Sequence, residues 1–247
     1  MQIKSFEVDK QELLFEDLGI IEYGKAWDYQ ESLLQRNVGL KTEARNSNNG
    51  TSPKDVKTIN YFLICEHPAV FTLGKSGDIS HLLINETQLK DKQIGFYKTN
   101  RGGDITFHGL QQIVGYPILD LEKFSTDLGF YLRNLEEVII KTIAEFGIKG
   151  ERSKGETGVW IEPDIPGRAR KICAIGVRCS RWITMHGFAL NVNTDLSYFN
   201  LIIPCGIHHK QVTSIEKEVG KAVDYEEVKS KIKFYFNEVF STENILS

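Results

Sequence analysis

Two stretches of the chain repeat apolar residues at the period of an α-helix. Between Asp127 and Gly147, apolar side chains return every three or four positions, and the glycine stands where a helix would end. Between Val223 and Phe240, Lys and Glu alternate with aliphatic and aromatic residues at the same period. A looser version of the pattern runs from Tyr23 to Arg36. The sequence therefore predicts three helices that each bury one face.

Strands are predicted where short apolar runs end at turn-forming residues. Tyr61–Glu66 and Val70–Leu73 are apolar runs that stop at His-Pro and at glycine, as buried strands do. Ile3–Val8 and Glu12–Phe15 are predicted to be short strands near the N-terminus. Because the long helices lie between blocks of strands and do not alternate with them, the pattern favours the α+β class over an alternating α/β fold.

Residues 41–57 interrupt this pattern. The stretch KTEARNSNNGTSPKDVK has almost no apolar residues and is rich in Asn, Ser, Lys and Gly. We predict a mobile loop here and not a domain boundary, because too little chain precedes it to build a core. A chain of 247 residues, 41% of them hydrophobic, can bury a sizeable core, so residues 1–247 are expected to form a single domain.

Charge and cysteine content exclude several classes of protein. The formal net charge is -3 with both signs mixed along the chain, which gives no basic footprint for nucleic acid. The N-terminal residues lack the apolar core of a signal peptide, and no apolar run approaches the ~18 residues that a membrane span needs. Four cysteines at unrelated spacings are typical of thiols in a reducing compartment. We therefore expect a cytoplasmic protein that binds neither membrane nor nucleic acid.

The densest group of chemically useful residues lies between Lys171 and Gly206. Lys171 opens a β-prone run, residues 171–177, whose two faces are both apolar, so this run is predicted to be an internal strand. A lysine at the edge of such a strand is partly desolvated, which favours its neutral form and lets it accept a proton. Alternatively, its stem extends along the strand and carries the ammonium to water.

Cys205 differs from the other cysteines of the chain in its neighbours. Pro204 fixes the backbone before it, and Gly206 leaves space beside it for a substrate. Lys171 would increase its thiolate fraction if the chain folds back between them, which the turn-prone residues 178–181 allow. The alternative is a small buried hydrophobic residue. The Cys and His residues of this region lack the spacing of a zinc site, so no metal is predicted.

A second group of polar residues starts at Arg101. Gly102 and Gly103 remove side chains where something must approach the backbone closely or where φ is positive. Arg101 offers a planar cationic fork, and Thr106 and His108 would share one face of an extended segment. The alternative is a tight turn followed by a strand with a solvated face.

Two further features concern charge and titration. The segment 168–181 contains several basic residues and no acidic one, so it is predicted to steer anionic partners, the alternative being a solvated strand edge. His81 lies in a polar stretch and has no partner visible in the sequence.

The chain resembles the lipoyl(octanoyl) transferases, which move octanoyl from acyl carrier protein to a lysine of lipoate-dependent enzyme domains. The resemblance runs over nearly the whole chain and rests on ordered motifs. They are EHPAVFTLG (66–74), RGGDITFHG (101–109), KICAIG (171–176), HGFALNVN (186–193) and PCGI (204–207). It implies the fold of biotin/lipoate protein ligase catalytic domains, a mixed β-sheet with flanking helices, which agrees with the α+β prediction.

The resemblance also implies roles by position. Cys205 matches the acyl-thioester nucleophile, and Lys171 matches the lysine that lowers its pKa. The residues that match the acyl and substrate pocket are Arg101, Gly102, Gly103, Asp104, Ile105, Thr106, Phe107, His108, Ala174, Ile175, Gly176, Gly187, Phe188 and Ala189. The chain departs from the family pattern His-Gly-Pro-Gly-Gln at His108-Gly109-Leu110-Gln111-Gln112, so another loop shape is expected there.

The implied reaction has two steps. The Cys205 thiolate takes octanoyl from octanoyl-acyl carrier protein, and a lysine of a lipoyl domain then attacks the octanoyl-enzyme, with Lys171 as proton acceptor. The implied acceptors are the lipoyl domains of 2-oxoacid dehydrogenases and the glycine cleavage H protein, and no metal, nucleotide or other cofactor is needed. The alternatives are an ATP-dependent lipoate or biotin protein ligase, and a non-catalytic module that binds lipoyl domains.

Overall fold

The computed structural model describes residues 10–47, 52–203 and 211–245. Its strands are β1 (Gln11–Ile20), β2 (Asn60–Glu66), β3 (Val70–Leu73), β4 (Gly95–Lys98), β5 (Ile105–His108), β6 (Gln112–Ile118), β7 (Val159–Ile161), β8 (Arg170–Ser180), β9 (Ile183–Asn191), β10 (Gln211–Val212) and β11 (Thr242–Ile245). Its α-helices are α1 (Tyr23–Asn46), α2 (Glu86–Asp91), α3 (Leu128–Ala144), α4 (Ile215–Val219) and α5 (Tyr225–Phe240). Short 3₁₀ helices are η1 (Pro53–Asp55), η2 (Ile79–His81), η3 (Leu121–Lys123) and η4 (Leu196–Leu201).

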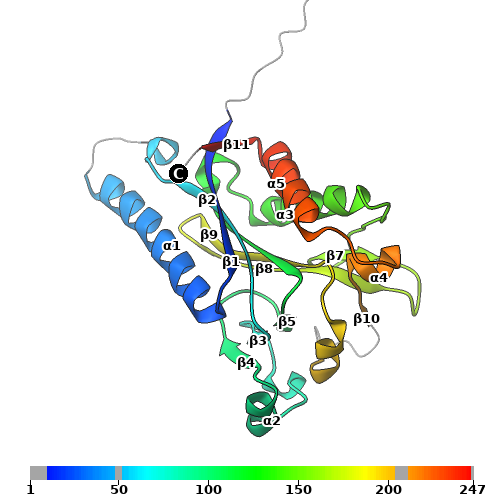
Figure 1. Cartoon of the computed structure of the whole chain (residues 1–247). Helices are drawn as coiled ribbons and strands as arrows, with labels where there is room; N and C mark the ends of the chain where they lie inside the picture. The colour runs from blue at the N-terminus through cyan, green and yellow to red at the C-terminus, as the bar shows by residue number, and fades with distance from the viewer. Residues whose placement is uncertain (1–9, 48–51, 204–210, 246–247) are drawn as a thin grey trace, which may run out of the picture.

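The main sheet is mixed. Its strands lie in the order β10-β8-β9-β6-β2-β1-β11, and β7 pairs with β8 beside this path. β1 runs parallel to β2 and β11, whereas the β2-β6, β6-β9 and β8-β9 pairs are antiparallel. A smaller sheet, β4-β3-β5, lies with α2 at one end of the molecule (Figure 1). The predicted α+β class and mixed sheet are therefore confirmed.

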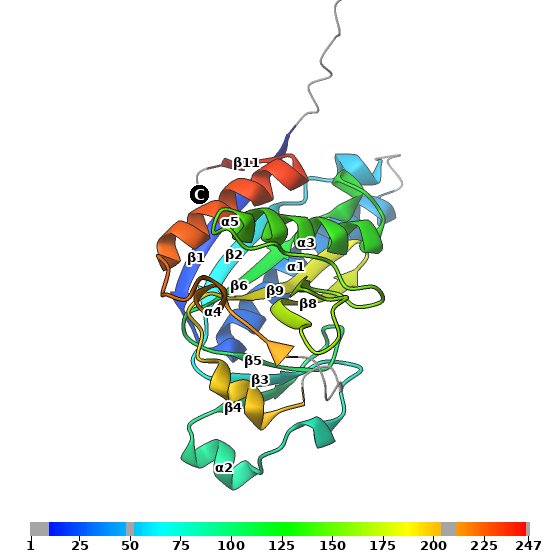
Figure 2. The same cartoon turned by 90° about the vertical axis from the view of Figure 1, so that its right-hand side faces the viewer.

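Helices cover both faces of the main sheet. α3 and α5 pack side by side on one face, and α1 lies on the other (Figures 1 and 2). β2 supplies both cores because successive residues of a strand point to opposite faces. Phe62 and Ile64 belong to the core under α3 and α5, whereas Tyr61 and Leu63 belong to the core under α1.

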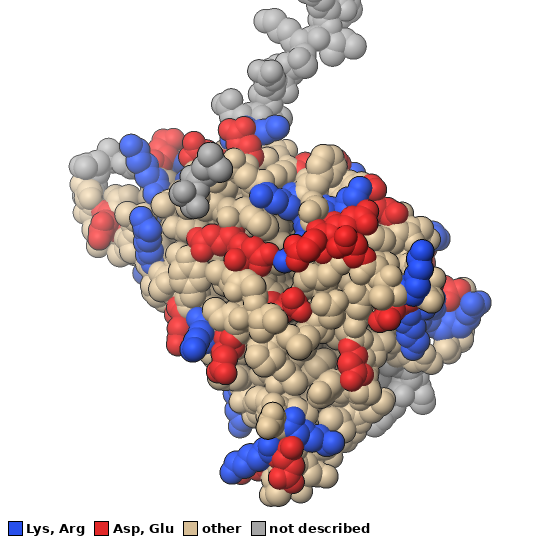
Figure 3. All heavy atoms as spheres, viewed as in Figure 1, with Lys and Arg blue, Asp and Glu red and all other residues tan. Residues whose placement is uncertain are grey.

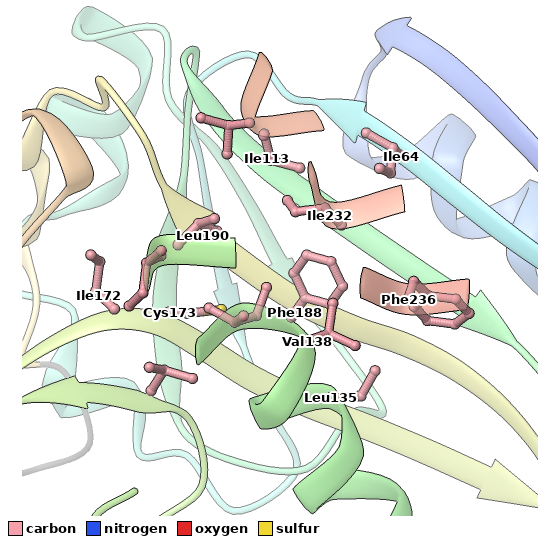
Figure 4. Packing of buried hydrophobic residues seen from close by; sticks show 14 of the residues in the cluster. Ile64, Ile113, Leu135, Val138, Ile172, Cys173, Phe188, Leu190, Ile232 and Phe236 are labelled. Atoms are coloured by element: carbon pink, nitrogen blue, oxygen red, sulfur yellow. The ribbon is translucent and has the colours of Figure 1, made fainter. Parts of the chain in front are cut away.

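The core under α3 and α5 is closed by aromatic and branched side chains. Phe62 of the sheet and Phe236 of α5 stack with ring centroids 4.1 Å apart, and Leu135 and Val138 of α3 reach the same layer as Phe188 of β9 (Figure 4). Burying each of these side chains contributes on the order of 1.5–3 kcal/mol to the free energy of folding. This layer fixes the position of the main sheet, which carries much of the site described below.

The two strongly periodic segments are helical, as predicted. α3 and α5 start one or two residues after the predicted positions, each behind an aspartate whose carboxylate accepts a hydrogen bond from a backbone N–H of the first turn. These residues are Asp127 and Asp224. α3 ends at Ala144, and Gly147 follows with φ +74°, in the left-handed conformation typical of the residue beyond a helix.

The strand predictions are confirmed where the structure describes them. β2 and β3 match the predicted buried runs, and Glu12–Phe15 lies within the longer β1. The predicted strand Ile3–Val8 lies outside the described residues. The chain also reverses near the turn-prone residues 178–181. Residues 178–180 still belong to β8, and β8 and β9 form a hairpin whose turn residues, Arg181 and Trp182, have φ of 50° and 66°.

The prediction of a loop over residues 41–57 is wrong at its start. Residues 41–46 are the last turns of α1, which is ten residues longer than predicted from Tyr23–Arg36. These turns bury little apolar surface and are held by charge instead, because Lys41 Nζ lies 2.7 Å from Asp120 and 2.6 Å from Glu122. Residues 48–51 lie outside the described part of the chain, and residues 53–55 form η1.

No helix in the described ranges is long and apolar enough to cross a membrane. On the face shown in Figure 3, Lys and Arg are interspersed with Asp and Glu, and acidic side chains form a band across the middle. This face therefore presents no basic surface of the size that nucleic-acid binding needs.

Candidate active site

A cavity of about 700 Å³ lies between the main sheet, the smaller sheet and the loop that joins β4 to β5. All the pocket residues predicted from the resemblance line it except Phe107, and Lys171 lines it as well. Phe107 lies on the opposite face of β5 from Thr106 and His108, and its ring stacks on that of Tyr198 with centroids 4.5 Å apart. The sequence motif thus includes one residue that packs into a core and not into the cavity wall.

A bulge in β8 turns Lys171 away from its neighbours. Simple alternation predicts that Lys171 and Cys173 share a face, but Ile172 and Cys173 both lie in the core under α3 and α5. Trp160 of β7 pairs with Lys171 while Val159 pairs with Cys173, so β8 holds one extra residue at this point. The bulge lets Cys173 be buried while Lys171 lines the cavity.

Lys171 is half-buried and its side chain is held along the cavity wall. Its Nζ lies 4.5 Å from the centre of the Trp160 ring, a cation–π contact. A Cβ at Gly158 would come within 3.5 Å of Lys171 Cε and within 2.6 Å of the carbonyl oxygen of Cys173, so the side chain packs where glycine leaves room. The Nζ end of Lys171 therefore stays at the cavity and does not extend freely into water.

The chain that carries Cys205 is fixed on both sides of the segment 204–210. Cys205 itself lies outside the described residues. Before the segment, the N–H of Ile203 donates to the carbonyl of His81 at 2.8 Å. After it, Val212 of β10 pairs with Lys171, and the N–H of Thr213 donates to the carbonyl of Lys171 at 3.0 Å. The residue before the segment is thus bonded to His81 and the chain after it is bonded to Lys171, and both of these residues line the cavity.

Arg101 organises the loop 101–104. Its Nη2 donates to the carbonyl and the hydroxyl of Thr72 at 2.7 and 2.9 Å and to the carbonyl of Asp104 at 2.8 Å. The loop packs closely against β8, because a Cβ at Gly176 would lie 2.7 Å from the carbonyl oxygen of Gly102. The glycines at 102 and 103 were expected to let something approach the backbone closely. Part of that close contact is made by the backbone of β8 at Gly176.

Two cavity histidines, His108 and His186, are buried, and each makes hydrogen bonds through its ring. His108 contacts Thr72 Oγ1 at 3.3 Å and Gln112 Oε1 at 2.8 Å, and burial lowers its pKa well below the usual value. His186 Nε2 lies 2.8 Å from Asn100 Oδ1, and burial lowers its pKa to about 3. Neither imidazole takes up a proton readily at neutral pH.

We expect acid to destabilise the fold through its buried histidines. Burial lowers the pKa of His186 to about 3 and that of His67, which contacts Ile21 and Tyr116, to about 4. The unfolded chain binds these protons near pH 6.5, so the free energy of unfolding falls as pH drops from about 6.5 toward 4, by about 1.4 kcal/mol per pH unit per histidine. Urea denaturation across this range measures the fall. His67→Asn should make it shallower, and an equal slope in that variant would contradict this assignment.

His81 and Asp104 form a pair that the sequence did not reveal. His81 Nδ1 lies 2.6 Å from Asp104 Oδ2, although the two residues are 23 positions apart and belong to η2 and to the loop before β5. No spacing rule links residues brought together by a loop. Both residues line the cavity.

The loop after His108 is a tight turn despite its departure from the family pattern. The N–H of Gln112 donates to the carbonyl of Gly109 at 3.3 Å, and Gln111 has φ 61°, a conformation that favours glycine. Gln111 is held there because its N–H donates to Glu66 Oε2 at 2.6 Å and its Oε1 accepts from Asn193 at 2.9 Å.

Much of the basic segment 168–181, which is predicted to steer anionic partners, forms ion pairs within the protein. Arg170 forms ion pairs with Glu162 at 2.5 Å and Glu218 at 2.6 Å, and Arg178 pairs with Glu31 at 2.7 Å. Sequence reasoning missed this because the acidic partners come from other elements.

Solved structures share this fold. A bipartite lipoate protein ligase and its E2 lipoyl domain from Thermoplasma acidophilum gives a TM-score of 0.61 at 16% identity, covering 96% of this chain and 88% of the other. A lipoate-protein ligase A bound with ATP gives 0.63 at 14%, covering 96% and 90%. At these identities the likeness shows the fold, which is that of the lipoate protein ligases.

The sequence places the chain more narrowly. The model of the lipoyl protein ligase A/B catalytic domain matches residues 22–237. A protein from Christiangramia forsetii named octanoyltransferase is 56% identical over 234 residues, covering 94% of this chain and 97% of the relative. The chain therefore belongs to the lipoyl protein ligase A/B catalytic domain family, within its octanoyltransferases, and it is an acyltransferase.

Proposed function

We propose that the protein transfers octanoyl from octanoyl-acyl carrier protein to a lysine of lipoyl domains, through a thioester on Cys205. The acceptors are the lipoyl domains of 2-oxoacid dehydrogenases and the glycine cleavage H protein. The observation that carries this proposal is the anchoring of the chain around Cys205. Ile203 is bonded to His81 and Val212 is paired with Lys171, and both partners line one cavity.

In the first step, the Cys205 thiol gives its proton to Lys171 and the thiolate attacks the carbonyl carbon of the carrier thioester. A new C–S bond forms, and the C–S bond to the carrier breaks. The departing carrier sulfur takes the proton back from Lys171, so the lysine returns to its neutral form. Backbone N–H groups stabilise the oxyanion between these events.

In the second step, the neutral amine of the acceptor lysine attacks the same carbonyl carbon. A C–N bond forms, the C–S bond to Cys205 breaks, and the Cys205 sulfur ends as a thiol. The nitrogen must lose a proton to a base, and Lys171 is the candidate that the motif offers for this transfer. The net change is amide formation at the expense of a thioester, without a nucleotide.

The cavity suits an acyl chain. Its volume of about 700 Å³ lies within the range of small-molecule pockets. Val114, Phe188, Ala189 and Leu132 provide apolar wall, while Lys171 stands on the wall beside the chain that leads away from Cys205. An apolar tail and a reactive carbonyl can therefore be accommodated together.

An assay without ATP separates the proposed function from its alternatives. Purified protein is mixed with octanoyl-acyl carrier protein and an apo lipoyl domain, and the acceptor mass is followed. We expect octanoylation of the acceptor at the same rate with and without ATP. In a parallel reaction with free octanoate in place of the carrier thioester, transfer that depends on ATP would indicate a ligase. An acceptor that stays unmodified in both reactions would indicate a binding module.

A further inference from the structure

His81 has the geometry of an acid–base group at the cavity. Its Nδ1 lies 2.6 Å from Asp104 Oδ2, and the other oxygen of this carboxylate accepts from the N–H of Ile105 at 2.7 Å. The carboxylate is therefore fixed by two hydrogen bonds. Because a carboxylate favours the proton on the ring nitrogen that it contacts, Nε2 is the acceptor of the neutral ring.

The exposure of His81 separates it from the other histidines that line the described cavity. A quarter of its side chain is exposed, so substrate and solvent can reach it. His108 and His186 are buried, and burial lowers the pKa of each. Of these three, His81 alone combines a carboxylate partner with access to solvent.

The backbone of His81 also adjoins the chain that leads to Cys205. Its carbonyl accepts from the N–H of Ile203, and its neighbours Leu82 and Leu83 pair with Ile202 and Leu201. Asp78 caps η2 by accepting from the N–H of Ser80 at 2.9 Å. The turn that presents His81 is thus held at both ends.

We propose that His81, oriented by Asp104, is the base that takes the proton from the acceptor lysine amine during transfer from the enzyme. This inference rests on the proposed function and deepens it, because it divides the proton transfers between two residues. As the C–N bond forms and the C–S bond to Cys205 breaks, the amine proton passes to His81 Nε2. Lys171, which the first step leaves neutral, takes up a proton from solvent and gives it to the departing Cys205 sulfur, while His81 releases the amine proton to solvent, so the protons balance.

The test uses His81→Asn, since the asparagine amide can still donate to Asp104 but offers no base at the Nε2 position. Octanoyl-enzyme is formed with excess octanoyl-acyl carrier protein, separated, and mixed with an apo lipoyl domain in single-turnover experiments from about pH 6 to 9. We expect enzyme octanoylation to stay close to wild type. Transfer to the lipoyl domain should slow by about 10²-fold or more and lose its histidine limb in the pH profile.

Two further variants separate catalysis from structure. Asp104→Asn should slow the transfer step by about tenfold, because the ring loses its oriented tautomer. Asp78→Asn keeps the helix cap and removes a carboxylate near His81 that does not contact the ring, so it should leave both steps unchanged. None of the three variants, His81→Asn, Asp104→Asn and Asp78→Asn, changes the other charged residues that line the cavity. These are Arg101, Glu156 and Lys171.

The outcomes are distinct. Equal slowing of both steps in His81→Asn, or a transfer profile with an unchanged pH dependence, would show that His81 acts only as a structural link and would overturn the inference. Wild-type protein that forms no octanoyl-enzyme would overturn the proposed function and this inference with it. Octanoyl-enzyme that forms normally and transfers slowly in the variant supports both.

Discussion

Cys205→Ser is expected to abolish octanoyl transfer, with a loss of at least about a thousandfold in kcat, as happens when a covalent nucleophile is removed. A serine hydroxyl at this position has the same reach but is far less ionised than a thiol. The rate of lipoyl-domain octanoylation measures the effect. A Cys205→Ser protein with wild-type activity would contradict the covalent route.

The other three cysteines provide matched controls. Cys65 and Cys173 are fully buried, Cys179 is half-buried, and burial raises the thiol pKa of each, so they are poor nucleophiles at neutral pH. Cys179→Ser, Cys65→Ser and Cys173→Ser should each retain measurable transfer. The two core variants are compared at equal folded fraction, because a hydroxyl replaces a thiol in a packed core.

Lys171→Ala is expected to slow octanoylation of the enzyme by about 10²-fold or more, since it removes the base and cation beside the chain that bears Cys205. Iodoacetamide alkylation of Cys205 should titrate below the reference pKa of about 8.5 in wild-type protein and move upward in this variant. Alkylation profiles that coincide would show that the two residues are not neighbours. The alkylation is best followed in a protein in which Cys205 is the only cysteine, made by combining Cys65→Ser, Cys173→Ser and Cys179→Ser.

Lys171→Arg separates charge from proton transfer. Arginine keeps the positive charge over Trp160 but cannot accept a proton at working pH. If Lys171 acts through charge, the arginine variant keeps the low thiol pKa and most of the rate of enzyme octanoylation. If Lys171 acts as a base, the low thiol pKa persists but octanoylation slows, because no group returns a proton to the departing sulfur.

Periodicity predicted the elements that bury a continuous face. α3 and α5 each pack one face on the sheet. Apolar residues on one face of a helix must recur about every 3.6 residues, whichever elements they pack against. Periodicity did not predict the last ten residues of α1, because this end of the helix is held by the ion pair between Lys41 and Asp120, which lies 79 positions away. Charge pairs between distant elements leave no local pattern.

The sequence motifs identified most residues that line the cavity, but they did not predict how those residues are arranged. Gly102 and Gly176 are set side by side, as their small size suggests. Alternation wrongly placed Lys171 on the face of Cys173, because β8 holds one extra residue between them. Phe107 sits inside a cavity motif and faces a core. The His81–Asp104 pair depends on how η2 packs against the 101–104 loop, which no sequence rule describes.

The most direct test of this account is the mass of the protein after incubation with octanoyl-acyl carrier protein alone, without ATP and without acceptor. We expect the mass of one octanoyl group to be added, to map to the peptide containing Cys205, and to be removed by neutral hydroxylamine, as a thioester is. Addition of a lipoyl domain should return the enzyme to its original mass. A protein that stays unmodified while transfer proceeds, or an adduct on another residue, would contradict the thioester mechanism.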